Sequence, residues 1–120
     1  MPDKREMPDF SKPPAELAHR FVSVLAERPA ASPRQMFGNP AAFVNGNLAT
    51  GLHAGRWFVR LPEADAAELT AAGGGPFEPM PGRPMRGYIV LPSAMAEDPA
   101  IAGSWVDRAI GHVAGLPPKK

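Results

Sequence analysis

Arginine and aromatic residues alternate near the middle of the chain, and this spacing could support binding chemistry. Side chains two residues apart in a strand point to the same side, so Arg56, Phe58 and Arg60 should share one face. Arg86 and Tyr88 would join them if a later strand enters the same sheet. Such a face suits a protein contact, base stacking or a small ligand, and it also fits an ordinary solvated sheet surface.

Other reactive residue types do not form a known catalytic or metal-binding motif. His19, His53 and His112 are the only histidines, and no two of them have the close spacing of a motif such as H-E-x-x-H. Glu97-Asp98 is typical of a helix start rather than an acid–base pair. No serine or threonine lies in a recognisable nucleophile motif. We therefore expect no catalytic residue, metal or cofactor, and we favour a non-enzymatic function while leaving an enzyme open.

The glycine run Gly73–Gly75 could cradle a phosphate, but its surroundings favour a helix end. A P-loop glycine run is followed by Lys-Ser or Lys-Thr at the start of a helix, whereas here Pro76 follows. A second hypothesis is a ligand pocket between the sheet and the connections near Arg34, Arg83 and Arg86. It predicts a concave site with converging polar groups.

The composition restricts the class of protein. A chain of 120 residues is the size of one domain. Its net charge of +1 gives no overall attraction for nucleic acid, so direct nucleic-acid binding is disfavoured. The chain has no cysteine, no apolar signal core at its N-terminus and no apolar run long enough to cross a bilayer. We expect a soluble cytoplasmic protein with no membrane contact.

Two turns predict how three successive strands pair. If Asn45-Gly46 and Ala54-Gly55 are two-residue hairpin turns, three pairs of residues face each other across the strands. These pairs are Phe43 with Leu48, Leu52 with Trp57, and Thr50 with Val59. Regular alternation then predicts a core face of Phe43, Leu48, Leu52, Trp57, Val59 and Leu61. The opposite face would carry Val44, Ala49, Gly51, His53, Arg56, Phe58 and Arg60.

The remaining elements complete a two-layer arrangement. Apolar residues at helical spacing predict a first helix from Pro14 to before Pro29, and a last helix after Asp98-Pro99. The alanine-rich segment 63–72 predicts a short helix, and 85–91 a strand with a short partner strand before the turn at Pro81. The predicted core comprises Phe21, Leu25, Phe43, Leu48, Leu52, Trp57, Val59, Leu61, Ile89 and Trp105.

Several of these motifs together resemble the N-terminal domain of the TfoX/Sxy competence regulators. The resemblance rests on Met36-Phe37-Gly38, the two glycine turns, Gly75-Pro76-Phe77, Gly82-Arg83 and Asp98-Pro99 with Trp105. It implies an α+β fold, a largely antiparallel sheet meander with helices packed on one face. It also implies a regulatory, interacting module linked to transcription or competence, whose partner would be another protein or a second copy of the chain.

The domain boundaries follow from the polar, proline-rich ends. We expect a disordered tail over residues 1–12, one domain over 13–115 and a second disordered tail over 116–120. Full-length competence regulators continue into a second helical domain, whereas this sequence stops at Lys120.

Overall fold

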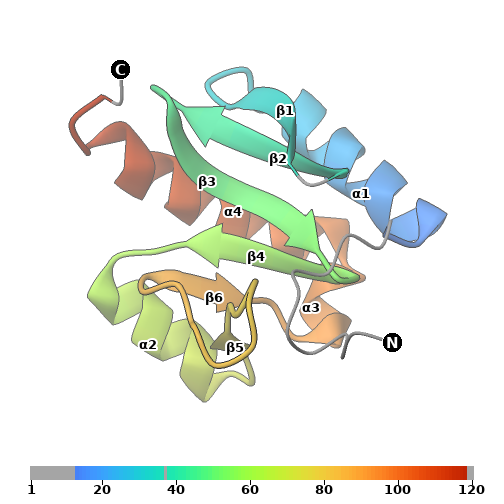
Figure 1. The fold of residues 1–120 in the computed structure, drawn as a ribbon. Helices are drawn as coiled ribbons and strands as arrows, with labels where there is room; N and C mark the ends of the chain where they lie inside the picture. Colours follow the sequence, from blue (N-terminus) through green and yellow to red (C-terminus); the bar gives the residue numbers. More distant parts are fainter. Residues whose placement is uncertain (1–12, 37, 119–120) are drawn as a thin grey trace.

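The fold is a single α+β unit in which helices cover one side of an antiparallel sheet (Figure 1). The computed structural model describes residues 13–36 and 38–118. The helices are α1 (Ala15–Ala26), α2 (Glu63–Ala71), α3 (Ser93–Ala96) and α4 (Pro99–Ala114). The strands are β1 (Ser32–Met36), β2 (Asn39–Val44), β3 (Asn47–His53), β4 (Arg56–Arg60), β5 (Gly75–Pro76) and β6 (Tyr88–Val90). They form one sheet in the order β1-β2-β3-β4-β6-β5, which confirms the predicted fold class.

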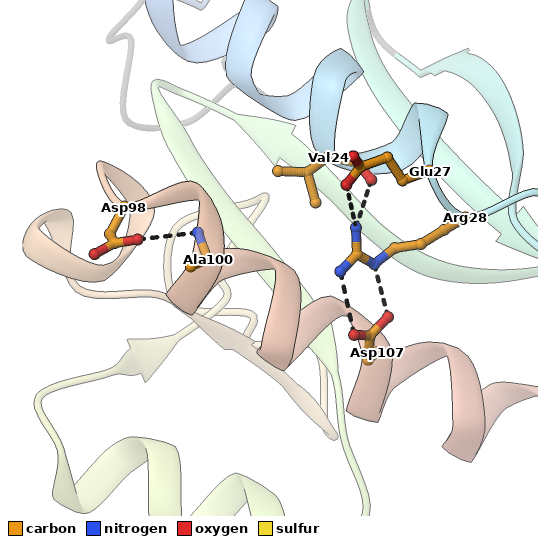
Figure 2. A network of polar contacts seen from close by, with 6 residues as sticks. All are labelled: Val24, Glu27, Arg28, Asp98, Ala100 and Asp107. Carbon is orange, nitrogen blue, oxygen red and sulfur yellow. Dashed lines mark hydrogen bonds and ion pairs between the residues drawn. The ribbon is translucent and has the colours of Figure 1, made fainter.

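Both predicted long helices are present and bury one apolar stripe each. In α1 the buried residues are Leu17, Phe21, Val24 and Leu25. Helix α4 begins after Asp98, whose carboxylate accepts hydrogen bonds from the backbone N–H groups of Ala100 (2.9 Å) and Ile101 (3.3 Å) (Figure 2). These bonds satisfy donors that have no partner within the helix. Helix α3 and strand β1 were not predicted, and β1 lies partly in what the sequence analysis took as a connection.

A bidentate ion pair fastens the end of α1 to α4 (Figure 2). Arg28 donates from Nε to Asp107 Oδ1 (2.6 Å) and from Nη2 to Oδ2 (3.1 Å), and Nη1 donates to the carbonyl of Val24. The hydrogen bond to Asp107 raises the pKa of Arg28. Gly103 leaves room for this guanidinium, because a Cβ there would lie 2.7 Å from Arg28 Nη2. The contact explains a glycine inside α4, where glycine otherwise lowers helix stability.

The two predicted hairpin turns and all three predicted strand pairings are confirmed. Both residues of each turn have positive φ, 52° and 81° at Asn45-Gly46 and 52° and 74° at Ala54-Gly55. Positive φ at both positions is the signature of a type I′ turn. The pairs Phe43–Leu48, Thr50–Val59 and Leu52–Trp57 face each other as expected.

A β-bulge in β3 nevertheless changes which side chains share a face. Ala42 pairs with Thr50 while the next residue, Phe43, pairs with Leu48, so Ala49 is an extra residue opposite β2. An extra residue shifts every side chain beyond it to the other face. The face prediction was therefore wrong before the bulge: Phe43 and Leu48 lie half-buried on the side away from the helices. In their place, Val44 and Ala49 join the helix-covered core.

The helix-covered core is centred on Trp57, which is fully buried. Its ring lies 5.1 Å from that of Phe21, and its Nε1 donates to Thr50 Oγ1 (2.9 Å). The Thr50 hydroxyl donates in turn to the carbonyl of Phe58 (2.7 Å), so the buried polar atoms of this pair are hydrogen-bonded. Of the other predicted core residues, half-buried Ile89 packs against this cluster and the following lie inside it: Phe21, Leu25, Leu52, Val59, Leu61 and Trp105.

The predicted tails are only partly within the described residues. Residues 1–12, 119 and 120 lie outside them, as does Phe37 of the Met36-Phe37-Gly38 motif. Within the predicted C-terminal tail, Leu116 packs against the core, and Asn47 Nδ2 donates to the carbonyl of Pro117 (2.9 Å). Across residues 13–36 and 38–118, no helix is long and apolar enough to cross a membrane.

Candidate functional site

The sheet face turned away from the helices, here called the outer face, contains the predicted arginine and aromatic residues. In Figure 1 no helix lies in front of β1, β2 or β3 on this side. Strand pairing places Arg34 of β1 beside Ala41 of β2, which faces Gly51 of β3, which in turn faces Phe58 of β4. The outer face is therefore built from residues that are far apart in the sequence.

Phe58 was predicted to be available to a partner, and the structure contradicts this. Its side chain is fully buried, stacked on Phe77 with ring centroids 4.1 Å apart and an interplanar angle of 12°. It also lies over Gly51, where an added Cβ would be 2.7 Å from Phe58 Cζ. Phe77 follows β5 and folds back over β4, a long-range contact that strand alternation does not reveal. Phe58 is thus the centre of a second, smaller apolar cluster.

Tyr88 and Arg60 are brought together as predicted for a shared sheet. Strand β6 pairs with β4 so that Tyr88 lies opposite Arg60, whose guanidinium carbon is 5.4 Å from the Tyr88 ring centroid. The Tyr88 hydroxyl donates to the carbonyl of Leu48 (3.2 Å). Burial raises the pKa of Tyr88, and the nearby Arg60 charge opposes that rise. The Tyr88 ring and the Arg60 guanidinium above it therefore form one pair.

The other two predicted residues lie apart from this pair. Arg56 is exposed at the opposite end of β4, and Arg86 is exposed in the segment that precedes β6. Arg86 therefore does not alternate with Tyr88 along a strand. The prediction treated residues 85–91 as strand, whereas β6 begins only at Tyr88.

A second arginine–aromatic pair lies on the other side of the outer face. The guanidinium carbon of Arg34 is 5.3 Å from the centroid of Phe43. Arg34 was predicted to lie near a ligand pocket and Phe43 in the core. Their contact was not predicted, because neither β1 nor the bulge was. Half-buried Leu48, opposite Phe43, lies on the same face. We call Arg34, Phe43, Leu48, Arg60 and Tyr88 the outer-face patch.

Charges are segregated between the two sides of the molecule although the net charge is only +1. The six strands contain three arginines and no aspartate or glutamate. With the segment 77–87, the sheet side has one carboxylate, Glu78, against Arg34, Arg56, Arg60, Arg83 and Arg86. The helices, their caps and Arg28, which follows the C-cap of α1, form the helical side. This side has Arg20, Arg28 and Arg108 against Glu16, Glu27, Glu63, Asp65, Glu68, Glu97, Asp98 and Asp107.

On the helical side, Arg28 and Arg108 form ion pairs and Arg20 donates to the carbonyl of Ala96 (3.3 Å), whereas no described carboxylate pairs with a sheet-side arginine. Arg28 binds Asp107, and Arg108 lies 3.0 Å from Glu68 and 4.3 Å above the Trp105 ring. In the part of the chain that the structure describes, none of the five sheet-side arginines forms an ion pair with a carboxylate. The sheet side therefore has positive charge that is not neutralised by described carboxylates.

An open cleft of about 550 Å³ lies beside the outer face near the end of β6. Glycines 73 and 75, together with Val90, line it, and Arg56, Glu78 and Ser93 supply its polar groups. This is not the position predicted for a ligand pocket, since Arg34, Arg83 and Arg86 do not line it. Neither Arg28 nor Tyr88, the groups with displaced pKa values, lines it either.

The glycine run itself ends α2, as the sequence predicted. Gly73 has φ 112°, a left-handed conformation that favours glycine, and the N–H of Gly74 donates to the carbonyl of Leu69 (2.9 Å). A hydrogen bond of this kind satisfies a carbonyl in the last turn of a helix. Within residues 13–36 and 38–118, no three His, Asp or Glu side chains are grouped so that they could hold a metal ion.

Comparison with known proteins gave one family match. The model of the TfoX N-terminal domain matches residues 23–113, which include every described strand and all of α2, α3 and most of α4. No curated protein matches the chain, and no solved structure matches it.

Proposed function

The chain belongs to the TfoX N-terminal domain family, and from this premise we propose that it is a non-enzymatic regulatory module that binds another protein through its outer-face patch. The observation that carries the proposal is a half-buried apolar pair, Phe43 and Leu48, between two arginines that each lie over an aromatic ring. Protein contact sites are enriched in arginine and aromatic residues around apolar centres.

The alternative of an ordinary solvated sheet face explains this patch less well. A solvated face has scattered apolar residues among polar ones of both signs. Here the apolar residues are adjacent, and the strands contain arginine without any carboxylate. Ordering two arginines over rings also costs side-chain entropy, which a contact surface recovers when a partner binds groups already held in place.

The proposal is tested by comparing two exposed apolar positions on opposite sides of the molecule. Leu48→Asp changes the centre of the patch, and Val22→Asp is the matched control, because Val22 is 58% exposed on α1. Affinity capture from lysate of the source organism, with quantitative mass spectrometry, should show a partner retained by wild type and by Val22→Asp and lost with Leu48→Asp. Light scattering across a concentration series checks whether that partner is a second copy.

The fold of both variants is checked by circular dichroism before binding is compared. A wild-type protein that stays monomeric and retains nothing beyond what Leu48→Asp retains would remove the proposal. Equal loss of the partner with both variants would also contradict it, because the contact would then not be located at the patch.

A second candidate function is favoured by the cleft beside β6. Its volume of about 550 Å³ is that of a small-molecule site, and Arg56 with Ser93 could bind an anionic group. A thermal-shift screen of small carboxylates and phosphates tests it, with Arg56→Gln as the variant that should abolish any stabilisation. Stabilisation that persists in Arg56→Gln would exclude the cleft as the binding site.

A further inference from the structure

We infer that the segment bound by the outer-face patch is an extended acidic stretch of polypeptide, with two carboxylates that bind Arg34 and Arg60 and apolar side chains between them. This inference rests on the proposed function and adds the chemistry and spacing of the partner. Charge complementarity supports it, because the described part of the sheet side has five arginines, four of them exposed, and a single glutamate.

The two arginines of the patch are arranged to bind carboxylates. A guanidinium has five N–H donors, so contact with one aromatic ring leaves donors that can bind a carboxylate. Arg34 lies over Phe43 at 5.3 Å and Arg60 over Tyr88 at 5.4 Å. A guanidinium edge matches the two oxygens of a carboxylate, which it binds with two parallel hydrogen bonds.

The spacing of the pair limits the partner's sequence. Arg34 is on β1 and Arg60 is on β4, three strand spacings apart, which is about 14 Å across the sheet. An extended chain advances about 3.4 Å per residue and points successive side chains to opposite sides, so two carboxylates about four residues apart would reach both arginines. Phe43 and Leu48 lie between them, where the intervening apolar side chains of the partner would pack.

The aromatic rings of the outer face do not favour nucleic acid. Binding of single strands uses exposed rings on which bases stack. Phe58 is covered by Phe77, Tyr88 is only 8% exposed, and the ring of Phe43 has Arg34 above it. The surface thus presents guanidinium edges and aliphatic groups rather than open ring faces, which suits carboxylates on a polypeptide.

The test is a selection of random displayed 12-residue peptides on the immobilised chain, followed by fluorescence anisotropy with the labelled consensus peptide. We expect enrichment of Asp or Glu pairs four positions apart with apolar residues between them. Arg34→Gln/Arg60→Gln should bind the peptide at least about tenfold more weakly, since a hydrogen bond to a charged group is worth about one tenfold step in affinity or more.

Two controls separate geometry from charge. Arg83→Gln/Arg86→Gln removes the same two charges from the neighbouring segment 77–87 and should keep the affinity within about twofold. Arg34→Lys/Arg60→Lys keeps the charge but loses the paired donors, so it should bind with intermediate affinity. Equal weakening by both glutamine doubles would overturn the inference, because net charge alone would then explain binding.

The remaining outcomes distinguish this inference from the proposed function. Enriched peptides without acids, whose binding is lost with Leu48→Asp, would overturn the acidic partner and leave the protein contact standing. Selection of no peptide, together with no captured partner, would overturn both. A labelled 20-base-pair duplex that binds more tightly than the peptide and weakens with Arg34→Gln/Arg60→Gln would assign the patch to nucleic acid instead.

Discussion

Both faces of the sheet contain aromatic residues, but these residues have different roles on the two faces. On the helix-covered face, Trp57 is fully buried beside Phe21, and its Nε1–H donates to Thr50 Oγ1. On the outer face, half of the surface near β4 is closed by the Phe58–Phe77 stack, and the other half, around Phe43 and Leu48, stays partly exposed. An aromatic residue on a strand therefore does not reveal by itself whether it stabilises the fold or contacts a partner.

The difference arises from what lies above each face. Helices α1 and α4 supply continuous apolar stripes to the inner face, whereas among the described residues the outer face is covered by the segment after β5, which folds back with Phe77. Substitutions on the inner face should change stability, and substitutions in the outer-face patch should change binding.

The largest effect is expected from Trp57→Ala on the inner face. It deletes the fully buried ring that lies against Phe21 and removes the donor to Thr50, which should lower the free energy of unfolding by about 3–5 kcal/mol. Urea denaturation followed by circular dichroism measures it. Leu48→Asp should lower the free energy of unfolding far less in the same experiment. A similar decrease for both variants would show that the two faces do not differ in their contribution to stability.

A smaller effect is expected from Gly51→Ala, which tests whether the closed half of the outer face is packed. The new methyl group would lie 2.7 Å from Phe58 Cζ and 3.2 Å from Ala41 Cβ, so overpacking should cost about 1–3 kcal/mol. Gly75→Ala is the matched control, because a Cβ there meets no atom within 4 Å. Equal stability of the two variants would show that the Phe58–Phe77 stack can shift to accept the methyl group at little energetic cost.

The smallest expected effect is a shift in the titration of Tyr88, the only tyrosine in the sequence. Burial raises its pKa, so absorbance at 295 nm should titrate at a higher pH in the folded chain than in the denatured chain, where the midpoint is about 10. The folded state then holds this proton more tightly than the unfolded state. Its contribution to stability is complete below about pH 10 and is lost as the pH rises through the folded-state pKa.

Tyr88→Phe is the control for that titration, since it removes the absorbance change and this part of the pH dependence. A folded-state midpoint at or below that of the denatured chain would show that burial of the ring is too slight to outweigh the nearby Arg60 charge. The outer face would then be open at β6 as well as at β3.

The sequence predicted the elements better than the surfaces they form. The hairpin turns, their registers, and the long helices follow from local signals such as Asn45-Gly46 and Asp98-Pro99, because positive φ and helix capping depend on a few adjacent residues. The bulge at Ala49 has no comparable signal, and strand β1 was hidden by Pro33 in a segment that resembles a connection. Each of these omissions moved Phe43 or Arg34 to the wrong surface.

By itself, the sequence determined the family resemblance, the antiparallel meander and the candidate arginine and aromatic residues. Only the tertiary structure decided that Phe58 is covered by Phe77, that Arg34 lies over Phe43, and that the described charged residues separate into a basic sheet side and an acidic helical side. The physical reason is how far apart in the sequence the interacting residues lie. Turns and caps are fixed by neighbours in the chain, whereas burial and surface charge depend on which distant segments pack together.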